Sequence, residues 1–248
     1  MRIKVGTCGF TSKHFNFFEV LEVQQTFYDI VNENTLKRWR KEAPNVEFTI
    51  KALQVITHEY NKSTYSRMKN TFGNGENYGH FKPTKEVQIA LDETIREARI
   101  LNAKIIVFQT PPSFKPNEVN INNLINFFST LSNNFIYAWE PRGEEWYRDL
   151  KILENIFSKI KAIHVVDPFR RESLTKGLKY YRLHGLGKGE LNYGYKYTDE
   201  DLNKLYEIVK RDIEENEEIY VMFNNIHSFN DALRFKSIIE ERKLNPSK

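Results

Sequence analysis

The sequence contains a single cysteine, Cys8, among its 248 residues. One thiol cannot form an internal disulfide, and it cannot supply the paired cysteines of a redox or metal site. No run of about 18 apolar residues is present, so the sequence predicts no transmembrane helix. The apolar stretch of a secretory signal peptide is also missing after Met1. We therefore expect a cytoplasmic location and no membrane partner.

A strong excess of either charge is also lacking. The sequence has 37 Lys and Arg residues and 33 Asp and Glu residues, which leaves a formal net charge of +4. This mild excess permits contact with nucleic acid but does not require a polyanionic partner. Hydrophobic residues make up 40% and charged residues 28%, a composition that excludes a disordered or collagen-like chain.

Short runs rich in β-branched and aromatic residues recur along the chain, and helix-like stretches separate them. The runs that we predict as strands are Ile3–Thr7, Glu19–Val23, Phe48–Ala52, Lys104–Gln109, Phe135–Glu140, Ala162–Asp167, Tyr180–His184 and Glu218–Asn224. Helical patterns cover residues 34–41, 84–101, 122–131, 146–158, 199–216 and 230–241. This alternation predicts an α/β fold, a single (β/α)₈ TIM barrel over residues 1–248, irregular in places and with a frayed tail at about 243–248. The glycine fingerprint of an open doubly wound sheet is absent after the first strand.

Residues 59–82 interrupt the alternation. They are polar, rich in glycine and hold several aromatic residues. In a barrel they form an extended loop after strand 3, on the face that carries active sites. Two interpretations remain open, a lid or binding loop and a surface insertion with a short helix.

Polar side chains stand at the ends of the predicted strands, where TIM-barrel enzymes carry their active sites. We expect catalysis from Glu22, Lys51, Glu140 and His184, and substrate binding from Gln109, Arg142, Arg182, Asn224 and Asn225. Glu22 and Glu140 are candidates for general acid and base, and they are also natural counter-ions for the cations. His184 suits a proton shuttle near neutral pH. Two roles are open for Lys51, the orientation of an oxyanion and the formation of a Schiff base. The alternative is a structural ion-pair network that fills the barrel.

A divalent metal is a competing possibility, with Glu140, Asp167 and His184 as ligands on three consecutive strand ends. No HxH or HExxH spacing supports it, so no cofactor is predicted. The loop Gly185–Gly189, which contains Lys188, follows the seventh strand, where barrels frequently bind phosphate. The expected partner is therefore a small molecule, and a phosphorylated or carboxylated one fits this loop.

Several motifs are similar to those of a known family. They are Val5-Gly6-Thr7-Cys8-Gly9-Phe10, Val20 to Tyr28, Phe48 to Ala52 with Ile56 to Glu59, Phe108 to Phe114, Trp139-Glu140-Pro141-Arg142 with Trp146, Tyr181 to Gly185, and Tyr220 to Asn225. From Val5 to about Phe235 the chain resembles the domain of unknown function 72 family, also called YecE-like proteins. The resemblance implies a TIM barrel without an established reaction. The family's recurrent polar positions match the residues selected above from the strand ends.

The chain departs from this family in places. Cys8 and Phe10 stand where many relatives have serine and tryptophan, and Asp29 stands where an arginine is common. We predict an enzyme that acts on a small hydroxylated or anionic metabolite by general acid–base chemistry at the C-terminal face of the barrel. The alternatives are a divalent-metal-dependent isomerase or phosphodiesterase, and a non-catalytic protein that binds a ligand or nucleic acid.

Overall fold

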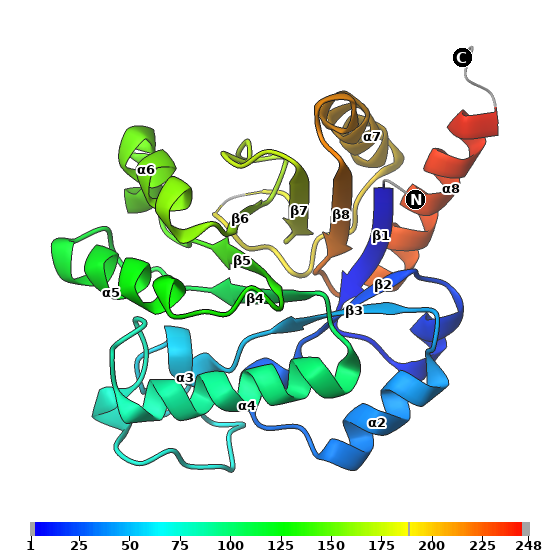
Figure 1. Ribbon diagram of the computed structural model, residues 1–248. Coiled ribbons are helices and arrows are strands. Elements are labelled where there is room, and N and C mark those ends of the chain that lie inside the picture. Colours follow the sequence, from blue (N-terminus) through cyan, green and yellow to red (C-terminus); the bar gives the residue numbers. More distant parts are fainter. Residues whose placement is uncertain (1–2, 188, 245–248) are drawn as a thin grey trace. The chain divides into compact units, whose positions relative to one another are not determined.

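The computed structural model describes residues 3–187 and 189–244. Lys188, predicted to contribute to phosphate binding, lies outside the described residues, as does the predicted frayed tail from residue 245 on. The elements, in chain order, are β1 (Ile3–Cys8), η1 (Ser12–Asn16), β2 (Val20–Val23), α1 (Gln25–Tyr28), α2 (Glu33–Glu42), β3 (Glu47–Lys51), α3 (Gln54–Thr57), η2 (Gly75–Asn77), α4 (Lys85–Leu101), β4 (Ile105–Gln109), α5 (Glu118–Ser129), β5 (Ile136–Glu140), η3 (Glu144–Tyr147), α6 (Leu150–Ile160), β6 (Ile163–Val166), β7 (Leu178–Leu183), α7 (Asp199–Glu215), β8 (Glu218–Phe223) and α8 (Ser228–Leu244) (Figure 1).

The order of the strands, β1 to β8, is that of a closed (β/α)₈ barrel, and this confirms the predicted fold class. Each predicted strand is present, and its ends lie within two residues of the prediction. The strands are largely apolar runs whose side chains are buried, as expected for parallel strands covered on both faces. Among the described residues, no helix is both long and apolar enough to span a membrane.

Two compact units divide the chain, and each is described by itself. The first unit comprises residues 1–22 and 164–248, and the second unit comprises residues 23–163. That residues 1–248 form a single domain stays a prediction.

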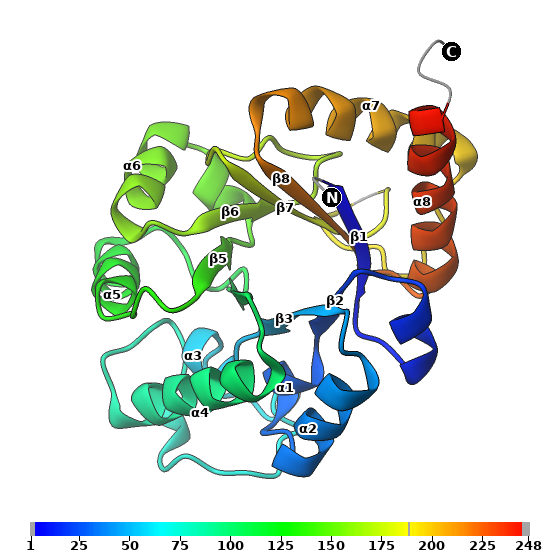
Figure 2. The same cartoon turned by 45° about the vertical axis from the view of Figure 1, so that its right-hand side comes forward.

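In the first unit, β8 pairs in parallel with β1 and with β7. Residues 167–177, all of them described, connect β6 to β7 without a helix. Helix α7 begins with a capping box, in which Thr198 Oγ1 accepts from the Asp201 amide and Asp201 Oδ2 accepts from the Thr198 amide. Helices α7 and α8 pack side by side (Figure 2).

In the second unit, β3, β4 and β5 pair in parallel, with Lys51 opposite Val107 and Gln109 opposite Glu140. Helix α4 buries one apolar face, which includes Val87 and Leu91, and α2 lies alongside it (Figure 1). The pairing fixes which side chains reach the carboxyl ends of these strands.

The extended loop after strand 3 is confirmed. Between β3 and α4 the chain forms α3, η2 and a long irregular segment. Asp29 Oδ2 accepts from the Lys69 amide at 2.9 Å, and Tyr65 Oη donates to the carbonyl of His58 at 2.6 Å. These contacts fasten the loop to the body of the second unit.

Candidate functional site

The predicted site residues lie at or just beyond the carboxyl ends of strands. Lys51, Gln109 and Glu140 end β3, β4 and β5, and Glu22 and Arg182 are the penultimate residues of β2 and β7. The residues that follow strands directly are Asp167, His184 and Asn224, and those one position further are Arg142 and Asn225. This agrees with the position of active sites in TIM barrels.

In the first unit, two side chains of β7 hold the carboxylate of Glu22. Tyr180 Oη donates to Oε2 at 2.7 Å, and Arg182 Nη2 donates to Oε1 at 2.9 Å. Tyr180 and Arg182 are two residues apart, so the strand places them on one face. Tyr181 takes the other face and donates to Asp212 of α7. The Glu22–Arg182 ion pair therefore lies on the face of β7 opposite α7.

This pair is deeply buried, since Glu22 is 0% exposed and Arg182 is 1% exposed. Burying two charges is costly, and short charge-assisted hydrogen bonds offset the loss of hydration. Both carboxylate oxygens of Glu22 have donors inside the first unit. The geometry therefore fixes the orientation of Glu22 and of its two donors.

His184 is buried next to Asn224. Asn224 Nδ2 lies 3.0 Å from His184 Nδ1, and the edge of the Tyr193 ring is turned to the imidazole at a centroid distance of 6.0 Å. With the amide donating to Nδ1, the neutral imidazole carries its proton on Nε2. The backbone amide of His184 donates to Asp167 Oδ2 at 3.2 Å. In this tautomer Nε2 is a hydrogen-bond donor.

The side chain of Asn225 bonds to Tyr195 and Asp231. Its Nδ2 donates to the carbonyl of Tyr195 at 2.7 Å and to Asp231 Oδ2 at 2.8 Å. Asp231 also accepts from the Tyr197 amide at 3.2 Å. Asn225 thus ties the β8–α8 connection to residues 195–197, and its predicted contact with substrate stays a prediction.

In the second unit, the amine of Lys51 is held at the end of β3. Lys51 Nζ donates to Gln109 Oε1 at 2.8 Å and lies 3.6 Å from the centroid of the Phe27 ring. A cation above an aromatic face is stabilised by the ring quadrupole. The Gln109 Nε2 in turn donates to the carbonyl of Thr110 at 2.9 Å, so the amide is fixed from both sides.

Glu140 and Arg142 form a second ion pair in this unit. Arg142 Nη2 lies 2.5 Å from Glu140 Oε1, and the two side chains are only 7% and 6% exposed. They come from the end of β5 and from the residue two positions beyond it. A guanidinium at this distance stabilises the ionised carboxylate, which suits a base better than an acid.

His58 was not among the predicted site residues, although it lies in one of the motifs that carry the family resemblance. It follows α3, and Thr57 Oγ1 lies 2.8 Å from its Nδ1. Burial first, and then the charges of Lys51, His80 and Arg142, together lower the pKa of His58 to about 3. The imidazole therefore stays neutral near pH 7, and its ring packs edge-on against Phe27 at 5.0 Å.

These residues bring two cations, a neutral imidazole and one carboxylate into electrostatic reach of one another. Lys51 and Arg142 both act on His58, and Arg142 contacts Glu140 directly. Such a group can bind an anionic substituent through the cations and can accept a proton on the carboxylate.

Metal ligands are not gathered in this way. In residues 3–187 and 189–244, no group of three or more His, Cys, Asp or Glu side chains is placed to hold a metal ion. Glu140, Asp167 and His184, the ligands of the metal-dependent alternative, therefore do not form a metal-binding group among the described residues.

Comparison with known proteins identifies the family. The family described as "Protein of unknown function DUF72" matches residues 10–248. The chain belongs to the DUF72 family. The predicted resemblance is therefore confirmed. No curated protein matches the chain.

Solved structures of DUF72 proteins share the fold. A DUF72 protein from Enterococcus faecalis V583 is 19% identical, with a TM-score of 0.73 over 96% of this chain and 97% of that one. A DUF72 protein from Thermotoga maritima MSB8 is 22% identical, with a TM-score of 0.71 over 97% and 100% of the two chains. A D-psicose 3-epimerase determined in the presence of D-fructose is 10% identical, with a TM-score of 0.53 over 98% and 99%. These likenesses support the TIM-barrel fold of this DUF72 protein.

Proposed function

We propose that this DUF72 protein is an enzyme that acts on a small hydroxylated or anionic metabolite by general acid–base chemistry. The observation that supports this most is the group of Lys51, His58, Glu140 and Arg142 in the second unit. Its cations outnumber its carboxylates. Lys51 and Glu140 end strands, Arg142 lies two residues beyond β5, and His58 follows the short helix α3. Clustered ionisable groups at the carboxyl ends of strands are typical of catalytic sites in barrels.

The roles follow from the contacts. Lys51, held by Gln109, and Arg142 bind a carboxylate or phosphate of the substrate. Glu140 is the general base, because its pairing with Arg142 favours the ionised form. Neutral His58 donates a hydrogen bond to substrate from Nε2 while Thr57 occupies Nδ1.

The first unit supplies further candidates. His184, whose Nδ1 lies beside the Asn224 amide, remains a candidate for contact with substrate through Nε2–H, and its role as a proton shuttle stays a prediction. Arg182 and Tyr180 hold Glu22 in one orientation, which fits a positioning role and leaves its role as the acid a prediction. Asn224 and Asn225 remain candidates for contact with substrate hydroxyl groups.

A ligand screen with four proteins tests the proposal. Thermal shifts are measured with neutral polyols, carboxylates and sugar phosphates on wild type, Lys51→Met, Glu140→Gln and Glu154→Gln. Glu154 is exposed on α6 and gives a matched control for Glu140. We expect an anionic metabolite to stabilise wild type and the control but not Lys51→Met, and Glu140→Gln to bind it without turnover detectable by NMR.

The alternatives are tested in the same series. Turnover that EDTA abolishes and Mn²⁺ restores would favour the metal-dependent alternative. Salt-dependent retention of oligonucleotides would favour nucleic-acid binding. A hit that stabilises all four proteins equally would exclude the proposed site as its binding place.

A further inference from the structure

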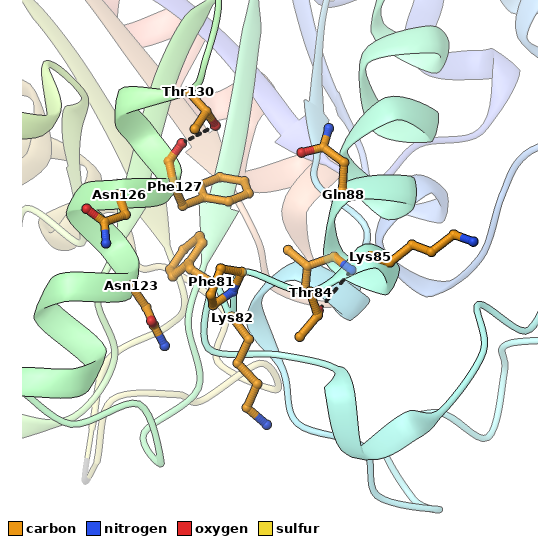
Figure 3. A pocket seen from close by; sticks show the side chains of 11 residues that line it. Phe81, Lys82, Thr84, Lys85, Gln88, Asn123, Asn126, Phe127 and Thr130 are labelled. Atoms are coloured by element: carbon orange, nitrogen blue, oxygen red, sulfur yellow. Dashed lines mark hydrogen bonds between the residues drawn. The ribbon is translucent and has the colours of Figure 1, made fainter.

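A cavity of about 330 Å³ lies between α4 and α5 in the second unit (Figure 3). Phe81, Val87 and Phe127 form its apolar floor, and they are 1%, 2% and 8% exposed. The cavity is of the size that small ligands occupy in proteins. None of its lining residues belongs to the candidate site described above.

The rim of the cavity carries neutral hydrogen-bonding groups. Gln88 of α4 and Asn123 and Asn126 of α5 are the amide-bearing residues of the lining (Figure 3). An apolar floor with a few amides at its edge matches a ligand with a ring and one polar substituent.

The two charged residues of the lining do not place their amines over the floor. Lys82 Nζ is engaged by Glu59 at 3.2 Å and by two backbone carbonyls at 3.1 Å. The amine of Lys85 extends away from Phe81 and Phe127 (Figure 3). No carboxylate is among the lining residues. An ionised ligand would lose hydration here without gaining a counter-ion, so the cavity favours a neutral one.

Phe81, one of the lining residues, ends a segment of left-handed backbone. Gly79, His80 and Phe81 have φ angles of 80°, 54° and 53°. Left-handed backbone is unusual for a bulky residue such as Phe81, and it persists only where the surroundings enforce it. At Gly79 a Cβ would approach the backbone nitrogen of Glu59 to 2.3 Å, so glycine is required there. Strain of this kind is concentrated at functional sites.

The strained segment is bound directly to the helix turn that precedes His58. The amides of Gly79, His80 and Phe81 donate to the carbonyls of Val55, Thr57 and Ile56 at 2.8, 3.2 and 2.9 Å. These acceptors belong to α3, whose C-cap is His58. On the cavity side, Asn123 Nδ2 donates to the carbonyl of His80 at 3.4 Å. The cavity and His58 therefore share one continuous set of contacts.

We propose that the cavity between α4 and α5 is a second binding site, for a small neutral molecule with one ring and one amide, carbonyl or hydroxyl group, and that its occupancy is transmitted to His58 through residues 79–81. The ring packs on Phe81 and Phe127, and the polar substituent bonds to the rim amides. The site does not depend on the reaction proposed above, because its ligand contacts none of the residues assigned to that reaction.

Benzamide is the probe, and benzoate is its charged counterpart. A tenfold excess of benzamide over its Kd should raise the Tm of wild type by roughly 3–6 °C. Asn126→Trp and Thr130→Trp, which place an indole at the exposed mouth, should abolish this shift. Asn122→Trp, exposed on the same helix and outside the lining, should retain it. Benzoate should bind at least tenfold more weakly than benzamide.

The coupling has its own readout. Benzamide should change the ¹H and ¹⁵N chemical shifts of the His58 imidazole in wild type and in Asn122→Trp, but not in Asn126→Trp. The site is overturned if benzamide does not bind saturably, if both mouth variants bind it as wild type does, or if benzoate binds as tightly. Saturable binding that leaves the His58 signals unchanged would overturn the transmission.

Discussion

Glu97 gives the sharpest test of the buried electrostatics. It lies in α4, is 1% exposed, and accepts a hydrogen bond from the Val31 amide at 2.6 Å. Burial raises the pKa of Glu97 from 4.5 to about 8, and this outweighs the lowering by the Val31 amide and Arg96. The carboxyl group is therefore neutral in the folded protein at pH 7.

The sign of the pH dependence follows from this. Between pH 4.5 and about 8 the folded state keeps a proton on Glu97 that the unfolded state releases. The free energy of unfolding therefore falls as the pH rises through this window, by up to about 5 kcal/mol in total. Glu97→Gln keeps an acceptor for the Val31 amide but cannot ionise. The variant should match wild type near pH 4.5 and be more stable above pH 8, by an amount that approaches this total.

Urea unfolding at half-unit steps from pH 4.5 to 9 measures the effect. Wild type and Glu97→Gln are compared with Glu154→Gln, whose carboxyl is exposed on α6. The difference between Glu97→Gln and wild type should grow with pH, while Glu154→Gln follows wild type within about 0.5 kcal/mol. A difference that is constant across the range would refute the assignment of a raised pKa to Glu97.

Three further predictions concern other parts of the chain. The His58 imidazole should not titrate between about pH 5 and 8 in ¹H–¹⁵N spectra of wild type. Lys51→Met should raise the low pKa of His58, because a nearby positive charge is removed. A titration midpoint of His58 near pH 6.5 in wild type would contradict this prediction. Arg182→Met should lower the free energy of unfolding by about 3–5 kcal/mol in urea titrations, because Glu22 stays buried without its guanidinium; a loss below about 1 kcal/mol would count against it. Lys161→Gly should raise the free energy of unfolding in urea by about 1 kcal/mol, because φ of Lys161 is 50° and glycine adopts this conformation without strain. Lys159→Gly, within α6, should lower the free energy of unfolding by about 0.5–1 kcal/mol. If both variants change the free energy of unfolding in the same direction, the reasoning is refuted.

The strands could be predicted because each is a short apolar run with β-branched or aromatic residues between polar segments. Two-residue alternation within a strand also explains why Tyr181 contacts Asp212 while Arg182 contacts Glu22 on the opposite face of β7. Helix ends were less predictable. Helix α5 begins at Glu118, four residues before the predicted start, because Asn117 caps it by accepting from the Asn120 amide.

The candidate site was predicted only in part. Strand-end polarity selected Lys51, Gln109 and Glu140, but it could not select His58, which follows a four-residue helix rather than a strand. Tyr180 was missed for a different reason, since a tyrosine inside an apolar strand has the pattern of a core residue. Left-handed backbone at Phe81 has no sequence signal, because a bulky aromatic residue does not favour that conformation.

The fastening of the long loop after β3 affects how this chain can change over evolution. Asp29 binds the amide of Lys69, and the strained segment at residues 79–81 is anchored on α3. Two separate spans, 59–68 and 70–78, therefore begin and end at fixed points. Insertions or deletions within either span can be absorbed locally, because loop closure costs little per added residue. Relatives could thus vary greatly in the length of this region while the anchor points that set His58 keep their places.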